Sequence, residues 1–187
     1  MGYARREPGI LHRLDNDTSG LVLAARSERA FEALRALLVG GAMDKRYLAL
    51  VANPSISPGI IDAPIAPHPS DPRRVHACLD PLDRRRAKAR PARTQIVEVT
   101  RVGARFALLE VRASVAVRHQ IRAHLAAVGH PLAGDWLYGG PGVEGLDRHF
   151  LHASRIALDH PFDRTRLDVG SPLPEALSTL VRRLERE

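Results

Sequence analysis

The sequence of 187 residues contains one cysteine, Cys78, few aromatic residues (4%) and no long apolar run. A single cysteine excludes an internal disulfide and a thiolate metal cluster, and it fits a reducing compartment. The longest apolar runs fall far short of the roughly 20 residues that a membrane span needs. Residues 1–7 carry charge without an apolar core, so they do not resemble a signal peptide. These absences predict a cytoplasmic globular protein that is not associated with a membrane.

The charge is strongly positive, with 28 Lys+Arg against 21 Asp+Glu and a net charge of +7. Basic side chains displace the counterions condensed on phosphate, so this excess favours a polyanionic partner such as a nucleic acid, and no protein partner is evident. Arginine-rich chains also arise from GC-rich genomes, which leaves charge alone ambiguous. The basic run at 84–90 is either a solvated face or a contact with the RNA backbone.

The length and the periodicity of apolar residues predict one α+β domain over residues 1–187, with a mainly antiparallel sheet. The predicted helices span 27–39, 118–128 and a C-terminal segment that begins near Pro174. The predicted strands span 45–51, 94–101, 105–112 and 151–158. Residues 52–93 carry most of the prolines and little periodicity, so we expect a functional excursion that contacts RNA, with a short hairpin near 60–65.

The segment LHRLDNDTSGL at 11–21 places polar side chains between apolar ones, which predicts partial burial. A buried carboxylate needs a charged partner or hydrogen-bond donors. Asp15 is therefore a candidate nucleophile or base, with Arg13 as the charge and Thr18 and Ser19 as neutral donors. The alternative is a structural ion pair in a loop where Thr-Ser only makes a turn.

The segment at 118–131 places Arg118 and Arg122 four residues apart on one helix face. An arginine at the edge of an apolar face can reach a buried carboxylate with both of its nitrogens. His119 and His124 are five residues apart, which does not suit a shared metal ion, and no HExxH motif occurs. The sequence therefore predicts no metal site.

Two further segments contain aromatic residues. The glycine-framed stretch GDWLYGG at 134–140 reads first as a packed turn. Tyr47 follows Lys45 and Arg46 in a predicted strand, where it is either a core residue or a stacking platform for a base.

Five segments, in this order along nearly the whole chain, resemble the RluA-type pseudouridine synthase family. They are HRLDNDTSGL at 12–21, KRYLALV at 45–51, HQIRAHLAAVGHPLAGDWLYG at 119–139, LHASRIALDHP at 151–161 and PLPEALSTLVRRL at 172–184. The resemblance implies a curved, mainly antiparallel sheet with flanking helices and a cleft. It also implies isomerisation of uridine to pseudouridine in rRNA or tRNA, without a metal or an organic cofactor.

The resemblance also implies roles for individual residues. Asp15 is the catalytic carboxylate, Arg122 pairs with it, and Tyr47 contacts the target base. Arg13, His119 and Gln120 complete the expected active site. The expected RNA contacts are Lys45, Arg84, Arg85, Arg86 and Arg118.

The chain departs from the family pattern in two places. A TGR-type triplet is expected before HQIR, but the sequence reads SVAVR at 114–118. Only eleven residues precede His12, whereas family members have several strands there and a Lys-Pro-Gly-like segment. We expect an open sheet edge, from either a truncation or a compact natural form. Two alternatives follow: an RNA-binding protein without catalysis on the same scaffold, or an unrelated hydrolase with Asp15 and Asp17 as a carboxylate pair.

Overall fold

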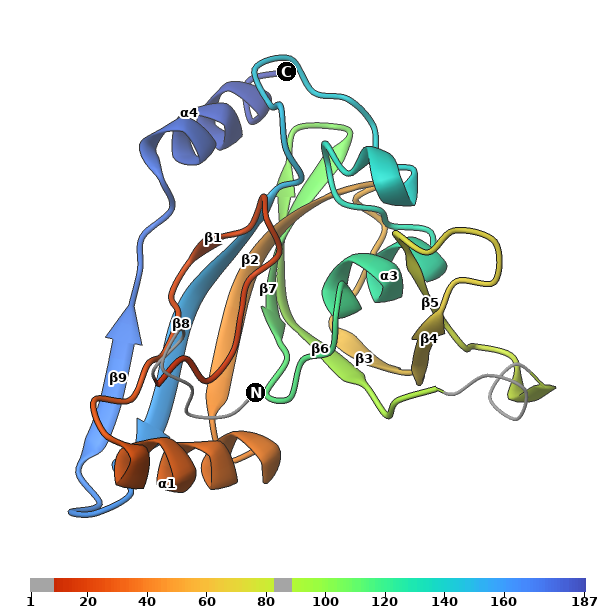
Figure 1. Cartoon of the computed structure of the whole chain (residues 1–187). Coiled ribbons are helices and arrows are strands. Elements are labelled where there is room, and N and C mark those ends of the chain that lie inside the picture. Colours follow the sequence, from red (N-terminus) through yellow and green to blue (C-terminus); the bar gives the residue numbers. More distant parts are fainter. Residues whose placement is uncertain (1–8, 83–88) are drawn as a thin grey trace.

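The computed structural model describes residues 9–82 and 89–187, which form a seven-stranded sheet with helices on both faces (Figure 1). The strand order is β1-β8-β2-β7-β6-β3, and β9 also pairs with β8. All neighbouring strands are antiparallel except β1 and β8, which run parallel. The predicted α+β class and the mainly antiparallel sheet are confirmed.

The strands of this sheet are β1 Ser19–Gly20, β2 Asp44–Ala52, β3 Gly59–Asp62, β6 Arg93–Val102, β7 Phe106–Arg112, β8 Leu151–Asp159 and β9 Arg166–Gly170. The helices are α1 Glu28–Val39, α3 Gln120–Ala127, the 3-10 turn η1 Trp136–Tyr138 and α4 Glu175–Leu184. Within the described ranges, none of these helices is long and apolar enough to cross a bilayer.

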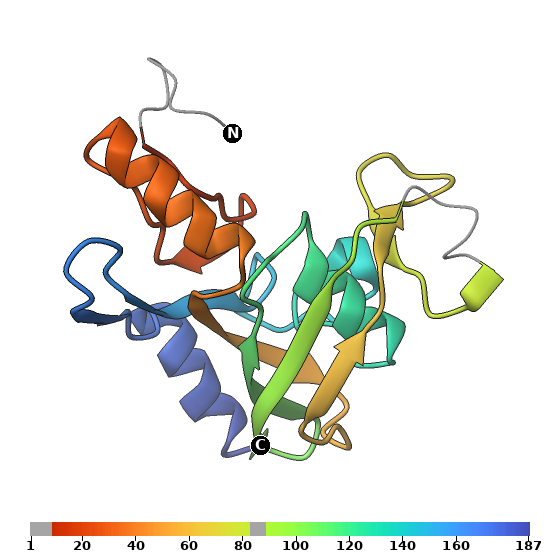
Figure 2. The ribbon, with the colours of Figure 1, turned by 90° about the horizontal axis from the view of Figure 1, so that it is seen from below.

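Helices α3 and α4 cover opposite faces of the sheet (Figure 2). Alternating residues of β2 supply both cores, because successive side chains of a strand point to opposite faces. Ala49 and Val51 pack in the cluster that contains Ile121 and Leu125 of α3. Leu50 packs instead with the apolar residues of α4. The strand is central because both of its faces are apolar.

Helix α1 anchors the N-terminal segment beside β8. The Ser27 side chain caps the helix by accepting a hydrogen bond from the Ala30 N–H at 3.2 Å. Phe31 and Leu34 pack with Leu11 and with Ile156 of β8. This third core fixes the start of the polar loop that contains Asp15.

The predicted hairpin near 60–65 is wrong. Strand β3 pairs with β6 of the main sheet, whereas β4 (Ile65–Pro67) pairs with β5 (Val75–Ala77) in a separate two-stranded ribbon. The ribbon packs against α3, since Ile65 and Val75 share an apolar cluster with Ala123. The two strands separate because each buries its apolar side chains against a different surface. Arg84, Arg85 and Arg86 lie outside the described residues.

Two other boundaries differ from the sequence predictions. Helix α3 begins at Gln120, not at residue 118, because His119 has a left-handed backbone with a φ of 52°. Strand β9 was not predicted, and each of its residues is exposed. An edge strand without a buried face lacks the apolar alternation that would reveal it in the sequence.

Candidate active site

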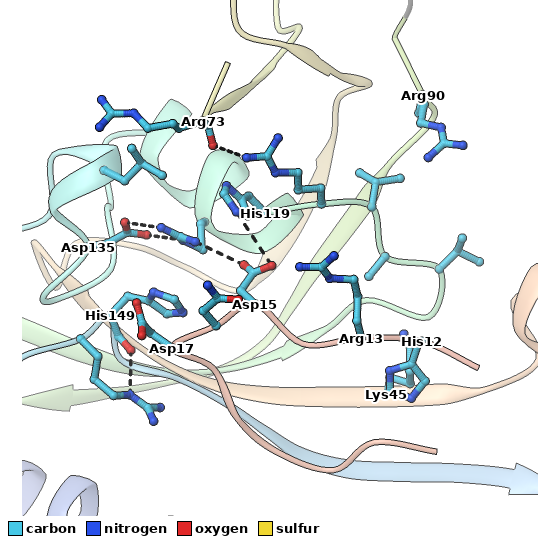
Figure 3. A pocket seen from close by; sticks show the side chains of 18 of the residues that line it. His12, Arg13, Asp15, Asp17, Lys45, Arg73, Arg90, His119, Asp135 and His149 are labelled. Atoms are coloured by element: carbon cyan, nitrogen blue, oxygen red, sulfur yellow. Dashed lines mark hydrogen bonds and ion pairs between the residues drawn. The ribbon is translucent and has the colours of Figure 1, made fainter. Parts of the chain in front are cut away.

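A cavity of about 970 Å³ lies between the 11–17 loop, the start of β2, the beginning of α3 and the turn at 134–137 (Figure 3). Its charged lining is mostly basic. The seven basic residues are Arg13, Lys45, Arg73, Arg90, Arg118, Arg122 and Arg148, and the four acidic ones are Asp15, Asp17, Asp135 and Asp147. This balance suits a ligand that carries negative charge.

Asp15 lies in the middle of the cavity, in a turn closed by the Thr18 N–H and the Asp15 carbonyl at 3.0 Å. Thr18 Oγ1 lies 2.8 Å from His149 Nε2, and Ser19 Oγ lies 2.9 Å from His152 Nδ1. The two hydroxyls therefore tie the loop to the residues around the start of β8. They do not solvate Asp15, so the sequence interpretation of these donors is wrong.

Arg122 holds the carboxylate of Asp15. Its Nη1 donates to Asp15 Oδ2 at 3.3 Å, while Nε and Nη2 donate to the two oxygens of Asp135 at 2.7 and 2.8 Å. The Asp135 side chain is only 1% exposed, so the bidentate pair is fixed in the interior. The Arg122 guanidinium also lies over the Tyr138 ring, 5.1 Å from its centroid. The expected pairing of residues 15 and 122 is present.

The guanidinium stays positive in this environment. Burial lowers the pKa of Arg122, but its hydrogen bonds and charge interactions with Asp135 and Asp15 outweigh burial and raise it above the ordinary value. Asp135 neutralises part of this charge, and one nitrogen remains for Asp15. Because the Asp15 side chain is 21% exposed, it has a fixed cation on one side and open cavity on the other.

His119 is a second neighbour of the carboxylate. Its Nε2 lies 4.0 Å from Asp15 Oδ1, and its Nδ1 lies 3.1 Å from the Tyr138 hydroxyl. Burial lowers the pKa of His119, and the charges of Arg122 and Arg118 lower it further, whereas Asp15 opposes the shift. The imidazole is therefore neutral at pH 7 and can act as a hydrogen-bond partner without adding charge.

Two of the expected site residues do not line the cavity. Gln120 is buried, and its side chain bonds to the Val117 N–H, the Arg93 carbonyl and Thr94 Oγ1. It fastens the start of α3 to β6. Tyr47 is 6% exposed, and burial together with the charge of Asp15 raises its pKa to about 12. The base contact expected of Tyr47 stays a prediction.

Three other predicted residues do line the cavity, namely Arg13, Lys45 and Arg118. Arg13 is exposed, and no hydrogen bond or ion pair joins it to Asp15 among the described residues. Arg118 donates to the carbonyls of Pro72 and Arg73 at 3.2 and 2.6 Å, which ties α3 to the β4–β5 ribbon. Asp15 thus takes its cation from α3 and not from its own loop.

Sequence reasoning missed Asp135. From the sequence, the glycine-framed stretch 134–140 is interpreted only as a turn. Two of its glycines are needed because neighbouring backbone atoms leave no room for a side chain. A Cβ on Gly140 would lie 1.9 Å from the Leu132 carbonyl oxygen. The missed signal is an acidic residue within an otherwise apolar turn. Within the described ranges, no three His, Cys, Asp or Glu side chains gather in a way that could hold a metal ion.

Comparisons with known proteins identify the family of the chain. Residues 2–127 match the model of the RNA pseudouridylate synthase family. The chain is 38% identical over 179 residues to an RNA pseudouridine synthase of Chloroflexus aurantiacus, covering 95% of this chain and 54% of the relative. It is 32% identical to the ribosomal large subunit pseudouridine synthase D of Escherichia coli K12, covering 92% of this chain and 54% of that protein.

A solved structure has a similar fold at lower identity. The human RNA pseudouridylate synthase domain containing 4 superposes with a TM-score of 0.71 at 22% identity, covering 95% of this chain and 76% of that one. The chain spans about half the length of the curated relatives it matches. With two thirds of its residues in the family model, the chain belongs to the RluA-type RNA pseudouridine synthases.

Proposed function

We propose that this chain isomerises uridine to pseudouridine in RNA, with Asp15 as the reacting carboxylate. The observation that carries the proposal is the pairing of Asp15 with an arginine that Asp135 holds in place, within a large cavity lined by cations. Relatives named for the large ribosomal subunit favour rRNA as the substrate, with tRNA as the alternative.

The reaction rearranges bonds within one nucleotide. The N1–C1′ bond breaks, the uracil turns, C5 bonds to C1′, the hydrogen on C5 leaves and N1 gains a proton. The atoms balance without an oxidant or a reductant. Asp15 either adds to C1′ or removes the C2′ proton. Both routes need a carboxylate oxygen directed at the nucleotide, and the hydrogen bond from Arg122 to Asp15 Oδ2 orients that group.

The target uridine has to leave its helix to reach a carboxylate inside a cavity. The cavity volume of about 970 Å³ lies within the range of pockets that enclose small ligands. Basic side chains around the opening attract the phosphate backbone, and aromatic side chains near it can stack on bases. Tyr47, whose pKa responds to the charge of Asp15, remains the proposed contact for the base.

The second candidate function is RNA binding without turnover. The altered segment at 114–118 favours it, because Arg118 is occupied by the ribbon carbonyls. A shared scaffold would then retain the cationic cavity while the chemistry is lost.

The two candidates differ in product. Wild-type protein and the Asp15→Asn variant are incubated with unmodified rRNA and tRNA transcripts, and pseudouridine is measured by chromatography and mass spectrometry of the nucleosides. We expect product only with the wild type, and retained RNA binding by both. Equal product from both proteins contradicts the role of Asp15, and binding by the wild type without any product favours the second function.

A matched variant tests whether Asp15 acts alone or together with a second carboxylate. Asp17 lines the same cavity two residues away, but in the described structure it makes no ion pair with Arg122. We expect Asp17→Asn to keep most of the product. A loss as severe as that of Asp15→Asn would favour the two-carboxylate alternative.

A further inference from the structure

Lys45 is a buried cation with no partner among the residues that the structure describes. It is 3% exposed and lines the cavity, yet no hydrogen bond or ion pair of its ammonium group occurs among the described residues. Lysine is rarely buried unless it is paired, because a charge loses its hydration inside a protein. Burial lowers the pKa of Lys45 to about 8, so the side chain is mainly charged at pH 7.

The residue type also stands out within this chain. Lys45 and Lys88 are its two lysines, and the other 26 of its 28 basic residues are arginines. Lysine provides a compact charge with three donors, whereas arginine provides a planar fork that suits carboxylates. A compact ammonium group suits a single oxygen of a ligand.

His12 adds a second donor at the same end of the cavity, where Figure 3 shows it against Lys45. Its Nε2 accepts a hydrogen bond from the Leu23 N–H at 3.2 Å, so the proton of the neutral ring lies on Nδ1. That nitrogen is buried and makes no hydrogen bond of normal length in the described structure, although a weaker interaction with the Arg13 backbone raises the pKa of the ring. Burial and the charge of Lys45 lower the pKa of His12 to about 4, which keeps the ring neutral at pH 7.

The neighbouring carboxylates do not serve Lys45. Asp44 binds Arg46 and Arg112, and Glu110 binds Arg46. Residues 44 and 46 alternate with residue 45 along β2, so these ion pairs lie on the opposite face of the strand. On the face of β2 that contains Lys45, Tyr47 follows about 7 Å further along at 3.3 Å per residue, beyond the residues that line the cavity. The ammonium group of Lys45 is therefore two residues along the strand from Tyr47, whose hydroxyl interacts with the charge of Asp15.

We propose that Lys45 and His12 bind an oxygen of an RNA backbone phosphate next to the uridine that enters the cavity. This proposal rests on RNA being the substrate and names a binding site within it. The phosphate supplies the acceptor that both side chains lack. The site positions the strand, and the chemistry stays with Asp15.

The small number of lysines makes a direct test possible. In protein labelled with ¹⁵N-lysine, the side chains of Lys45 and Lys88 give two signals, and Lys45→Met identifies one of them by its loss. The pKa of Lys45 is measured in the Asp15→Asn protein alone, with a saturating uridine-containing oligoribonucleotide, and with uridine nucleoside. We expect the oligonucleotide to raise this pKa by about 1 unit or more, and the nucleoside to leave it unchanged.

The salt dependence of binding provides a second readout. Loss of one phosphate contact should reduce the slope of log affinity against log salt by about 0.7 in Lys45→Met. Lys45→Arg should retain most of the slope. Arg182→Met, on the exposed side of α4, is the matched control and should match the wild type.

The outcomes distinguish the phosphate site from the catalytic proposal. An unchanged pKa of Lys45 in the saturated complex, or an unchanged salt slope in a folded Lys45→Met protein, overturns the phosphate site even where pseudouridine forms. A raised pKa without product from the wild type leaves the phosphate site standing and defeats the catalytic proposal. Absence of RNA binding contradicts both.

Discussion

The two ends of the cavity treat buried charge in opposite ways. At one end Arg122 is shared between Asp135 and Asp15, and each of its polar nitrogens has an acceptor. At the other end Lys45 and Nδ1 of His12 have none among the described residues. A paired end satisfies its buried charge within the protein, whereas an unpaired end costs stability until a ligand supplies the missing acceptor.

Breaking the paired end should have the largest effect on stability. Asp135→Ala leaves the Arg122 guanidinium buried without its bidentate partner, and we expect the free energy of unfolding to fall by about 3–5 kcal/mol. Urea denaturation measures this change. Asp147→Ala, an exposed carboxylate of the same cavity, should stay within about 0.5 kcal/mol of the wild type. A loss below about 1 kcal/mol in Asp135→Ala would show that the pair contributes little.

Removing the unpaired charge should act in the opposite direction. The pKa of Lys45 falls from 10.5 in the unfolded chain to about 8 in the folded one, so the cost of burying the charge is fully present below pH 8. We expect Lys45→Met to be more stable than the wild type at pH 7. The difference between the free energies of unfolding of Lys45→Met and the wild type should narrow by up to about 3 kcal/mol as the pH rises from 8 to 10.5. Denaturation at several pH values tests this, and a constant difference would contradict it.

The rim of the paired end carries the chain's single tryptophan, Trp136, which is 69% exposed. Stacking of a base on an exposed ring contributes about 1–3 kcal/mol. We expect RNA to quench the fluorescence of Trp136, and Trp136→Ala to weaken RNA binding by about tenfold with little change in stability. Unchanged fluorescence at saturating RNA would place the bound strand away from this rim.

The motifs predicted the central pair but not its surroundings. HRLD and HQIR place residues 15 and 122 in one site through the family resemblance, and the contact is present. Arg13 appeared to be the partner because it is near in sequence, whereas the cation comes from a helix 107 residues away. Contacts between distant segments leave no periodic signal, which is also why Asp135 was missed.

The burial of Lys45 could have been predicted from the sequence. In KRYLALV, residue 45 shares a strand face with Tyr47, Ala49 and Val51, and all four are buried. Its charge favoured an exposed interpretation as an RNA contact. A charged residue is therefore informative when the alternation of its strand predicts burial and its residue type predicts exposure. Strand β9 lacks even this signal, because neither of its faces is buried.

The role of Asp15 is tested most directly by single-turnover kinetics on one RNA that the wild type modifies. The rate of pseudouridine formation and the RNA affinity are measured for the wild type and for Asp15→Asn. We expect the rate to fall by at least about 10²–10⁴-fold while the affinity changes little. A variant that forms pseudouridine at the wild-type rate would contradict the assignment of this carboxylate.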